Sequence, residues 1–418
     1  MQAVTARPSN PKLVLAMLLI VYVFNFVDRQ ILSILAAPIQ AELKLDDAQM
    51  GLLGGVAFAL LYSTLGVPLA WIADRSSRTW VITVSLLLWS GFTALCGTAN
   101  GFWQLFLARL GVGIGEAGGV APSYAVIGDY FPSHRRALAL SVYSLGIPLG
   151  SAIGVLAGGY IAARVDWRTA FFVVGIGGVL IAPLFKLAVR DKRAAPGTGE
   201  TPRFGKVVGI LAAKPSFWFL SFGAAMSSMM GYGLAFWMPS LLQRSFGLDL
   251  VQSSRFLGAL MLTGGVAGVL AGGALGGQLG ARDRAFFAWV PAIAFAIGVP
   301  LYAAGIFSGS PWIAFLLFLI PSALAYIWLG PVITAVQHLV APAERATASA
   351  LFLLINNLIG LGGGIYALGA ISKALASTYG ADALRYSMLY SLVLYAISAL
   401  LMGLAGATLR RDWVSEVS

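Results

Sequence analysis

Long apolar segments alternate with short polar connections along the whole chain. Each apolar segment is about 20 residues or more, which lets a helix cross the roughly 30 Å hydrocarbon core of a bilayer. The alternation therefore predicts an all-α polytopic membrane protein with twelve transmembrane helices. We expect the spans at residues 12–38, 48–73, 79–98, 102–126, 136–162, 168–189, 214–243, 251–279, 285–306, 311–338, 345–372 and 385–409.

The connection at residues 190–213 is the only extended polar one. It contains Pro196 and Pro202 with glycines between them, which is typical of a flexible linker. This linker separates two sets of six spans. We therefore predict an N-terminal six-helix bundle at residues 1–189, a cytoplasmic linker, and a C-terminal six-helix bundle at residues 214–418.

The two halves also resemble each other in sequence. Arg136-Ala137-Leu138-Ala139 follows span 4, and Arg345-Ala346-Thr347-Ala348 follows span 10, half the chain later. A repeat of six spans is typical of secondary transporters, whose substrate site lies near the bilayer midplane between the two repeats.

Composition agrees with a membrane protein, because 59% of the residues are hydrophobic and only 10% are charged. The net charge of +11 does not indicate a nucleic-acid partner, since the basic excess sits in alternate short connections. Basic loops stay on the cytoplasmic side, so we expect both termini in the cytoplasm of a cell-membrane protein. One cysteine and two histidines argue against a metal site, and we expect no cofactor.

Two spans carry charges in the middle of their apolar runs. Span 1 contains Asp28 and Arg29, and span 4 contains Arg109 and Glu116. A charge at bilayer depth costs roughly 3 kcal/mol on insertion scales, so such residues usually face inward and have partners. The four charges sum to zero. We expect them to form the polar half of a transport site.

In span 1, Tyr22, Asn25 and Arg29 fall at helical spacing on one stripe, and Asp28 lies about 100° around the helix from Arg29. We interpret Arg29 as the group that meets an anionic headgroup, with Tyr22 and Asn25 beside it. Asp28 then tunes Arg29 or carries a proton. The alternative is a structural ion pair that locks span 1 to span 4.

In span 4, Arg109 and Glu116 share one face with Gly113 between them, and Glu116 lies about 10 Å deeper. Protonating Glu116 or Asp28 would leave two arginines with one carboxylate, a charge state that favours a phosphate. Releasing the proton would restore the internal pairs and expel the anion. We favour Glu116 as the proton carrier, and the alternative is a pair that only stabilises one conformation.

The second half contains almost no charge at membrane depth. Span 7 offers methionines and aromatics, which make adaptable apolar surfaces, and we place Met230, Tyr232 and Asn356 in the substrate site with Arg29 and Arg109. This asymmetry predicts an amphipathic cavity with a charged half for a headgroup and an apolar half for a tail. For any one of these apolar residues, ordinary helix packing is the alternative.

Several motifs resemble the major facilitator superfamily. Residues 66–80, GVPLAWIADRSSRTW, resemble its loop 2–3 signature, in which Asp74, Arg75 and Arg78 match. The resemblance implies that these three charges act as a gate or latch between spans 2 and 11; they could equally be topology signals. Ala70 and Ser77 stand where the signature has glycines. The segments at residues 109–116 and 146–154 resemble the family's span 4 and span 5 motifs.

Three further features resemble the spinster branch of that superfamily. They are Asn25-Phe26-Val27-Asp28-Arg29, Gly115-Glu116-Ala117 followed by Ala121-Pro122, and Arg345-Ala346-Thr347-Ala348. The resemblance implies a monomeric secondary transporter, proton-coupled and working by alternating access, whose substrate is an amphiphile of the sphingosine phosphate or lysophospholipid type.

Two alternatives remain open. Within transport, the chain could export drugs or small organic anions. From another class, it could be a membrane-embedded enzyme or a sensor. The sequence has no P-loop, no Gly-x-Ser-x-Gly elbow and no metal-ligand cluster, so we predict that it is not an enzyme. The expected partners are a lipid-like small molecule, protons and membrane lipids.

Overall fold

The computed structural model describes residues 9–191, 204–341 and 344–414, and these form helices joined by turns, without a strand. Eleven stretches are long and apolar enough to cross a membrane. The last of them, Thr347–Asp412, contains both of the last two predicted spans, which the turn at Gly380 (φ 52°) separates. The prediction of an all-α membrane fold is confirmed.

The chain forms two compact units, each described by itself. The first unit contains residues 1–35 and 60–198, and the second contains residues 36–59 and 199–418. The segment at residues 36–59, which runs from the end of span 1 into the first part of span 2, thus packs with the second half of the chain. The helices of the first unit are α1 (Pro11–Ile34), most of α4 (Ala57–Arg75), α5 (Arg78–Cys96), α6 (Phe102–Glu116), α7 (Val120–Tyr130), α8 (Ser133–Ser144), α9 (Gly146–Arg164) and α10 (Trp167–Ala188).

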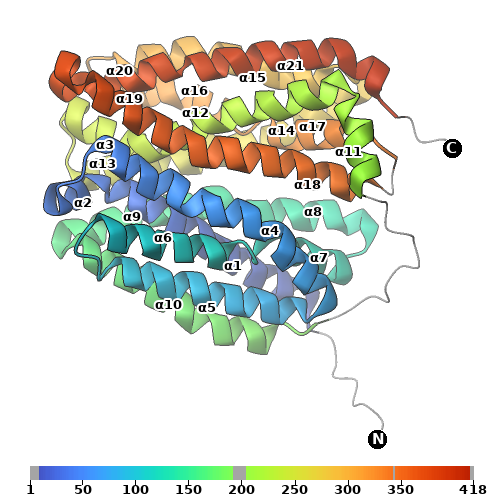
Figure 1. Ribbon diagram of the computed structural model, residues 1–418, viewed down its shortest axis with the longest axis horizontal. Helices are drawn as coiled ribbons and strands as arrows, with labels where there is room; N and C mark the ends of the chain where they lie inside the picture. The colour runs from blue at the N-terminus through green and yellow to red at the C-terminus, as the bar shows by residue number, and fades with distance from the viewer. Residues whose placement is uncertain (1–8, 192–203, 342–343, 415–418) are drawn as a thin grey trace, which may run out of the picture. The chain divides into compact units, whose positions relative to one another are not determined.

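The second unit begins with the short elements that lead from span 1 into the start of span 2 and continues with the helices of the second half (Figure 1). Within it, α12 packs on α19 and α21, and α15 packs on α21. Its elements are α2 (Ala36–Leu43), α3 (Asp47–Gly51), η1 (Leu52–Val56), α11 (Phe204–Ala212), α12 (Pro215–Phe246), α13 (Leu250–Leu260), η2 (Met261–Gly265), α14 (Val266–Arg282), α15 (Phe286–Ile306), α16 (Pro311–Leu324), α17 (Leu329–Gln337), α18 (Arg345–Asn356), η4 (Asn357–Gly363), α19 (Gly364–Tyr379), η5 (Gly380–Asp382), α20 (Ala383–Ser391) and α21 (Val393–Asp412).

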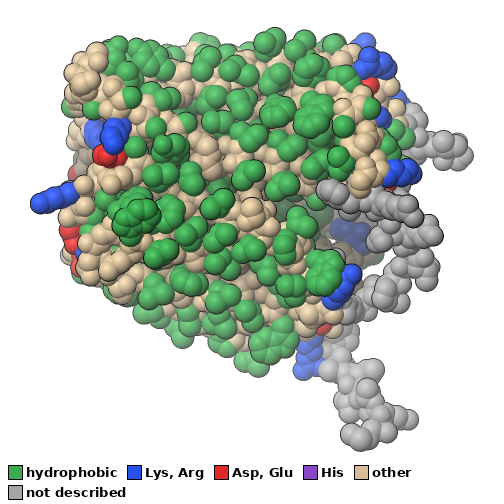
Figure 2. Space-filling model, viewed as in Figure 1, with side chains coloured by type: hydrophobic (Ala, Val, Ile, Leu, Met, Phe, Trp, Pro, Cys, Tyr) green, Lys and Arg blue, Asp and Glu red, His purple; other side chains and the backbone are tan. Residues whose placement is uncertain are grey.

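Hydrophobic side chains cover the face drawn in Figure 2, and the charged ones gather near the helix ends. Large apolar side chains such as Leu180, Leu187 and Leu316 are more than half exposed in the absence of lipid. A water-soluble protein buries most side chains of this kind. Their exposure here is what contact with lipid requires.

Glycines bring the helices of the first unit close together. A Cβ atom on Gly115 of α6 would lie 2.4 Å from the backbone nitrogen of Trp89 in α5, and one on Gly150 of α9 would lie 2.4 Å from the carbonyl oxygen of Val23 in α1. Small residues allow this approach in a membrane, where packing rather than water exclusion holds helices together. The close contacts fix α5, α6 and α9 around the charged stretch of α1.

Candidate functional site

The first ion pair of the site joins α1 to α6. The Nε atom of Arg29 donates to Oε2 of Glu116 at 2.8 Å. The Glu116 side chain is fully buried, and that of Arg29 is 12% exposed. A buried carboxylate and guanidinium in direct contact neutralise each other, and removing either one leaves an uncompensated charge that costs about 3–5 kcal/mol.

The second acid and the second base are also buried in these two helices. Asp28 of α1 is 1% exposed and Arg109 of α6 is 2% exposed, and the Asp28 carboxylate interacts electrostatically with both Glu116 and Arg109 of α6. The hydroxyl of Thr93 and the indole of Trp89, both from α5, lie beside Asp28. No described side chain hydrogen-bonds either Asp28 carboxylate oxygen at ordinary distance.

Each of the two helices contributes one acid and one arginine to this cluster. Arg29 of α1 pairs with Glu116 of α6, and Asp28 interacts electrostatically with Glu116 and Arg109. The four buried charges are therefore neutral as a group, and a change of one proton leaves a net charge that the surroundings do not solvate. This arrangement can hold an anion or exchange a proton; it also contains the structural ion pair that the sequence left as an alternative.

Aromatic rings surround the Arg29 guanidinium. Its central carbon lies 4.7 Å from the ring centre of Tyr62 in α4 and 5.1 Å from that of Phe26. Tyr22 stacks on Tyr143 of α8 with ring centres 4.2 Å apart, and Tyr124 of α7 lies edge-on to Tyr143 at 5.6 Å. An aromatic face over a guanidinium is an attractive contact that also restricts its orientation.

The sequence analysis missed Tyr62, Tyr124 and Tyr143, although it identified Tyr22. Their sequence signal is weak, since each is a single tyrosine within an apolar run, a pattern that also fits helix packing. Asn25, the other predicted member of the stripe, is 2% exposed, and its side chain lies within hydrogen-bonding reach of Glu116. The structure thus brings together Tyr22, Asn25, Asp28, Arg29, Arg109 and Glu116.

The three residues predicted in the second unit have different surroundings. Met230 is fully buried. Asn356, 4% exposed, accepts a hydrogen bond from the Ser228 hydroxyl at 2.8 Å at the point where α18 passes into the π-helical turn η4. Tyr232 is partly exposed on α12 and interacts electrostatically with Tyr326. Met230, Tyr232 and Asn356 therefore lie on two elements, α12 and α18, that pack together.

The charges of the loop 2–3 signature lie at an end of the first unit. Arg78 forms an ion pair with Asp129 of α7, and the Arg75 guanidinium lies 3.9 Å from the ring centre of Trp71. The Asp74 side chain lies outside the described residues. The Arg78–Asp129 pair ties the start of α5 to α7, and the Arg75–Trp71 contact lies within the end of α4.

In the described part of the chain, no three His, Cys, Asp or Glu side chains come together as a metal site would require. The charged groups of the site are instead matched arginines and carboxylates. The chemistry that the site offers is therefore ion pairing, hydrogen bonding and proton exchange.

The fold agrees with comparisons to known proteins. A family model of the Major Facilitator Superfamily matches residues 18–364. The chain is 34% identical over 403 residues to an MFS-type efflux pump of Mycolicibacterium smegmatis, covering 96% of this chain and 93% of that protein. It is 27% identical over 383 residues to the sphingosine-1-phosphate transporter SPNS2 of Danio rerio, covering 85% and 75%.

A solved structure is also similar over nearly the whole chain. It is the crystal structure of a bacterial homolog to the human lysosomal transporter spinster, in an inward-facing and unoccupied conformation. The TM-score is 0.87 and the sequence identity 31%, covering 97% of this chain and 99% of that one. The chain belongs to the major facilitator superfamily and is a spinster-like membrane transporter, not an enzyme.

Proposed function

We propose that this chain is a secondary active transporter for an anionic or zwitterionic amphiphile of the sphingosine phosphate or lysophospholipid type. The observation that carries the proposal is the set of buried charges on α1 and α6. Arg29 pairs directly with Glu116, and a guanidinium can bind a phosphate through two parallel hydrogen bonds. Arg29 and Arg109 are the proposed headgroup ligands, with Tyr22 and Asn25 beside them.

Proton coupling follows from the neutrality of the four charges. When Glu116 takes up a proton, Arg29 loses its carboxylate partner and the site gains one positive charge, which favours the phosphate. When the proton leaves, the Arg29–Glu116 pair forms again and competes with the phosphate. We assign the proton to Glu116 because its oxygen contacts Arg29 directly. Asp28 is the second candidate carrier.

The tail of the amphiphile is assigned to the second unit. Met230, Tyr232 and Asn356 lie on α12 and α18, and the middle of α12 also carries Met226, Met229 and Phe236. A methionine-rich apolar surface adapts to a flexible hydrocarbon chain. Asp74, Arg75 and Arg78 are the proposed gating charges on the cytoplasmic side, in a monomer with both termini in the cytoplasm and six spans in each half.

The similarity to a sphingosine-1-phosphate transporter supports this substrate class. The higher identity to an efflux pump favours a second candidate, export of a compact drug or small organic anion through the same cavity. The two differ in whether an alkyl tail contributes to binding, because a hydrocarbon tail adds roughly 0.8 kcal/mol per buried methylene group.

Ligand competition on purified protein in nanodiscs separates the two candidates. Binding of sphingosine phosphate is compared with binding of phosphoethanolamine, its headgroup alone, at several pH values, in the wild type and in Arg29→Gln. The proposal expects that only the tailed molecule competes and that Arg29→Gln abolishes its binding. Equal binding of the headgroup alone would make the small-anion exporter the better description.

A further inference from the structure

A lysine lies where two neighbouring spans of the first unit meet at one end. Lys186 is in the last turn of α10, and its ammonium donates a hydrogen bond to the hydroxyl of Thr79, in the first turn of α5, at 2.7 Å. The same ammonium lies 4.9 Å from the ring centre of Trp80. The helices α5 and α10 pack against each other (Figure 1). Lys186 therefore bridges the ends of two adjacent spans.

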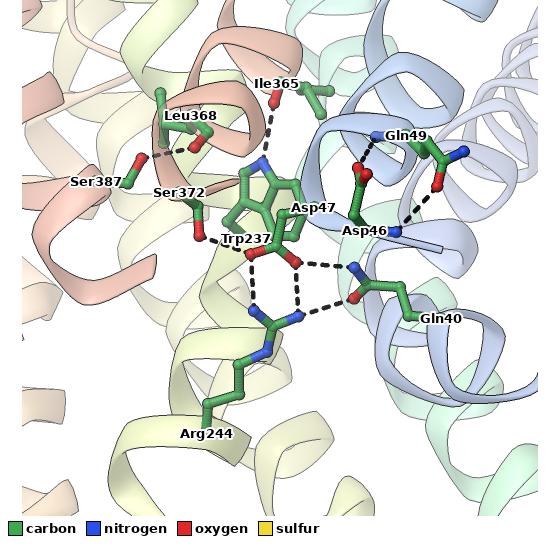
Figure 3. Close-up of polar contacts among 10 residues, drawn as sticks. All are labelled: Gln40, Asp46, Asp47, Gln49, Trp237, Arg244, Ile365, Leu368, Ser372 and Ser387. Atoms are coloured by element: carbon green, nitrogen blue, oxygen red, sulfur yellow. Dashed lines mark hydrogen bonds and ion pairs between the residues drawn. The ribbon is translucent and has the colours of Figure 1, made fainter. Parts of the chain in front are cut away.

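The Lys186 ammonium differs from the cation drawn in Figure 3, because no carboxylate pairs with it. In Figure 3, both terminal nitrogens of Arg244 donate to the Asp47 carboxylate, at 2.8 and 2.9 Å. Among the described residues, Lys186 contacts the Thr79 hydroxyl and the Trp80 ring and forms no ion pair. An ammonium has three N–H donors, and Thr79 accepts from one of them. Two donors and a full positive charge are left for an anion.

The end of α10 is held in place from two sides. The carbonyl oxygen of Arg190 accepts a hydrogen bond from the Tyr130 hydroxyl of α7 at 2.7 Å, and the Arg190 N–H donates to the Ser9 hydroxyl ahead of α1 at 3.2 Å. Phe185, the residue before Lys186, is fully buried. An anion that binds Lys186 therefore meets a backbone that is already fixed, which lowers the entropic cost of binding.

The surface around this end of the first unit is basic. Lys12, two residues after the N-cap of α1, is exposed, and so is Arg190 beyond the end of α10. The contact between Arg190 and Ser9 places the start of α1 and the end of α10 at the same end of the unit. Asp191 is exposed there as well. Basic side chains at a membrane surface attract anionic lipid headgroups.

Two exposed apolar stripes lead from Lys186 along the spans. On α5, Trp80 is more than half exposed and Val84 follows it one turn later, also exposed. On α10, Leu184 and Leu180 lie one turn apart and are both more than half exposed. The end of α10 meets the start of α5, so both stripes begin at the Lys186 end. A lipid whose headgroup binds Lys186 can lay its acyl chains along them.

We propose that Lys186, Thr79 and Trp80 form a binding site for the phosphate of an anionic membrane phospholipid, such as phosphatidylglycerol. The Lys186 ammonium binds the phosphate, the Trp80 indole lies beside the headgroup at the membrane interface, and the acyl chains follow α5 and α10. The lipid supplies the negative charge that the described residues do not. The site requires only that the chain spans a membrane, and it does not depend on the substrate of the proposed function.

Fluorescence quenching beside the site tests the proposal. In a Cys96→Ala background, Val84→Cys carries a bimane fluorophore one turn from Trp80, and the protein is placed in nanodiscs. Phosphatidylglycerol and phosphatidylcholine with the same spin-labelled acyl chain are compared as quenchers. We expect phosphatidylglycerol to reach half-maximal quenching at a roughly fivefold lower mole fraction, as one basic residue near the surface provides. Lys186→Gln should abolish this difference, and Lys186→Arg should keep it.

The matched control is Arg164→Gln, because Arg164 also lies over an aromatic ring, 4.3 Å from the ring centre of Tyr160, at the opposite end of the first unit. It should leave the preference at Val84→Cys unchanged. A bimane at the exposed Ile176→Cys, about 15 Å along α10 from Lys186, should show no preference. Size-exclusion profiles and thermal unfolding establish that each variant is folded.

The site is overturned if the preference for phosphatidylglycerol persists in folded Lys186→Gln. It is also overturned if the preference is lost equally in Arg164→Gln, or if it is the same at Ile176→Cys as at Val84→Cys. No transport substrate enters these measurements. A negative result is therefore distinct from failure of the proposed substrate class.

Discussion

At the scale of single residues, the charged groups of α1 and α6 are explained by what a buried charge requires. Glu116, Asp28 and Arg109 are nearly inaccessible, Arg29 is 12% exposed, and the four lie together on α1 and α6 with Arg29 paired to Glu116. Under the proposed function, a single proton is the smallest change that alters the affinity of this cluster for an anion.

The first prediction concerns Glu116→Gln, which mimics the protonated carrier. Arg29 then has no carboxylate partner at any pH, so binding of sphingosine phosphate at alkaline pH should be about tenfold tighter than in the wild type, and its pH dependence should disappear. Equilibrium binding in nanodiscs between pH 5 and 9 measures both. Glu344→Gln, which removes a carboxylate paired with Lys206, is the matched control and should behave as wild type. Wild-type pH dependence in Glu116→Gln would remove Glu116 from the carrier role.

The second prediction concerns Tyr62, whose ring lies over the Arg29 guanidinium. Tyr62→Leu removes a cation–π contact of about 0.5–1 kcal/mol, so amphiphile affinity should fall roughly two- to fivefold. Tyr62→Phe keeps the ring and should stay within twofold of wild type. If the two variants bind alike, the ring over Arg29 does not position it.

At the scale of helices, glycine placement decides how closely the charged elements approach. Gly115 lies against the Trp89 backbone, whereas nothing lies within 4 Å of a Cβ on Gly91 of α5. Gly115→Ala should lower the free energy of unfolding by about 1–3 kcal/mol through overpacking. Gly91→Ala should raise it by about 0.5–1 kcal/mol, because alanine favours a helix. Thermal unfolding in detergent measures both, and destabilisation of equal size in the two variants would contradict the packing account.

The helices themselves were predictable because a bilayer imposes a length and a polarity on every span. Interruptions inside the spans were not. The π-helical turns η1, η2 and η4, and the break between α16 and α17, depend on carbonyl and glycine contacts with neighbouring helices. For example, Gly268 of α14 lies against the carbonyl of Ala323, and Ala323 comes just before the break between α16 and α17. No local sequence pattern identifies Ala323 as the partner of Gly268.

The charged residues of the site were predictable from the sequence, but the residues that surround them were not. An acid and a base at bilayer depth stand out, so Asp28, Arg29, Arg109 and Glu116 were identified. Tyr62 and Tyr143 look like packing aromatics in a sequence. Asp47 resembles an ordinary loop charge, and its partner Arg244 lies 197 residues away.

At the scale of the whole molecule, the proposed function links the buried charges of α1 and α6 to a movement of the chain. Under that proposal these charges bind the headgroup and the proton, and alternating access requires that their loading controls which side of the membrane the site faces. The central claim is therefore that proton uptake at the buried charges drives movement of the amphiphile.

Flux in proteoliposomes tests this claim most directly. Purified protein is reconstituted, the membrane potential is clamped, and movement of sphingosine phosphate is followed with and without an imposed pH gradient. The account predicts that the gradient drives net accumulation in the wild type, that a protonophore abolishes it, and that Glu116→Gln retains exchange without accumulation. Wild-type accumulation that is equal with and without the gradient would contradict proton coupling at this site.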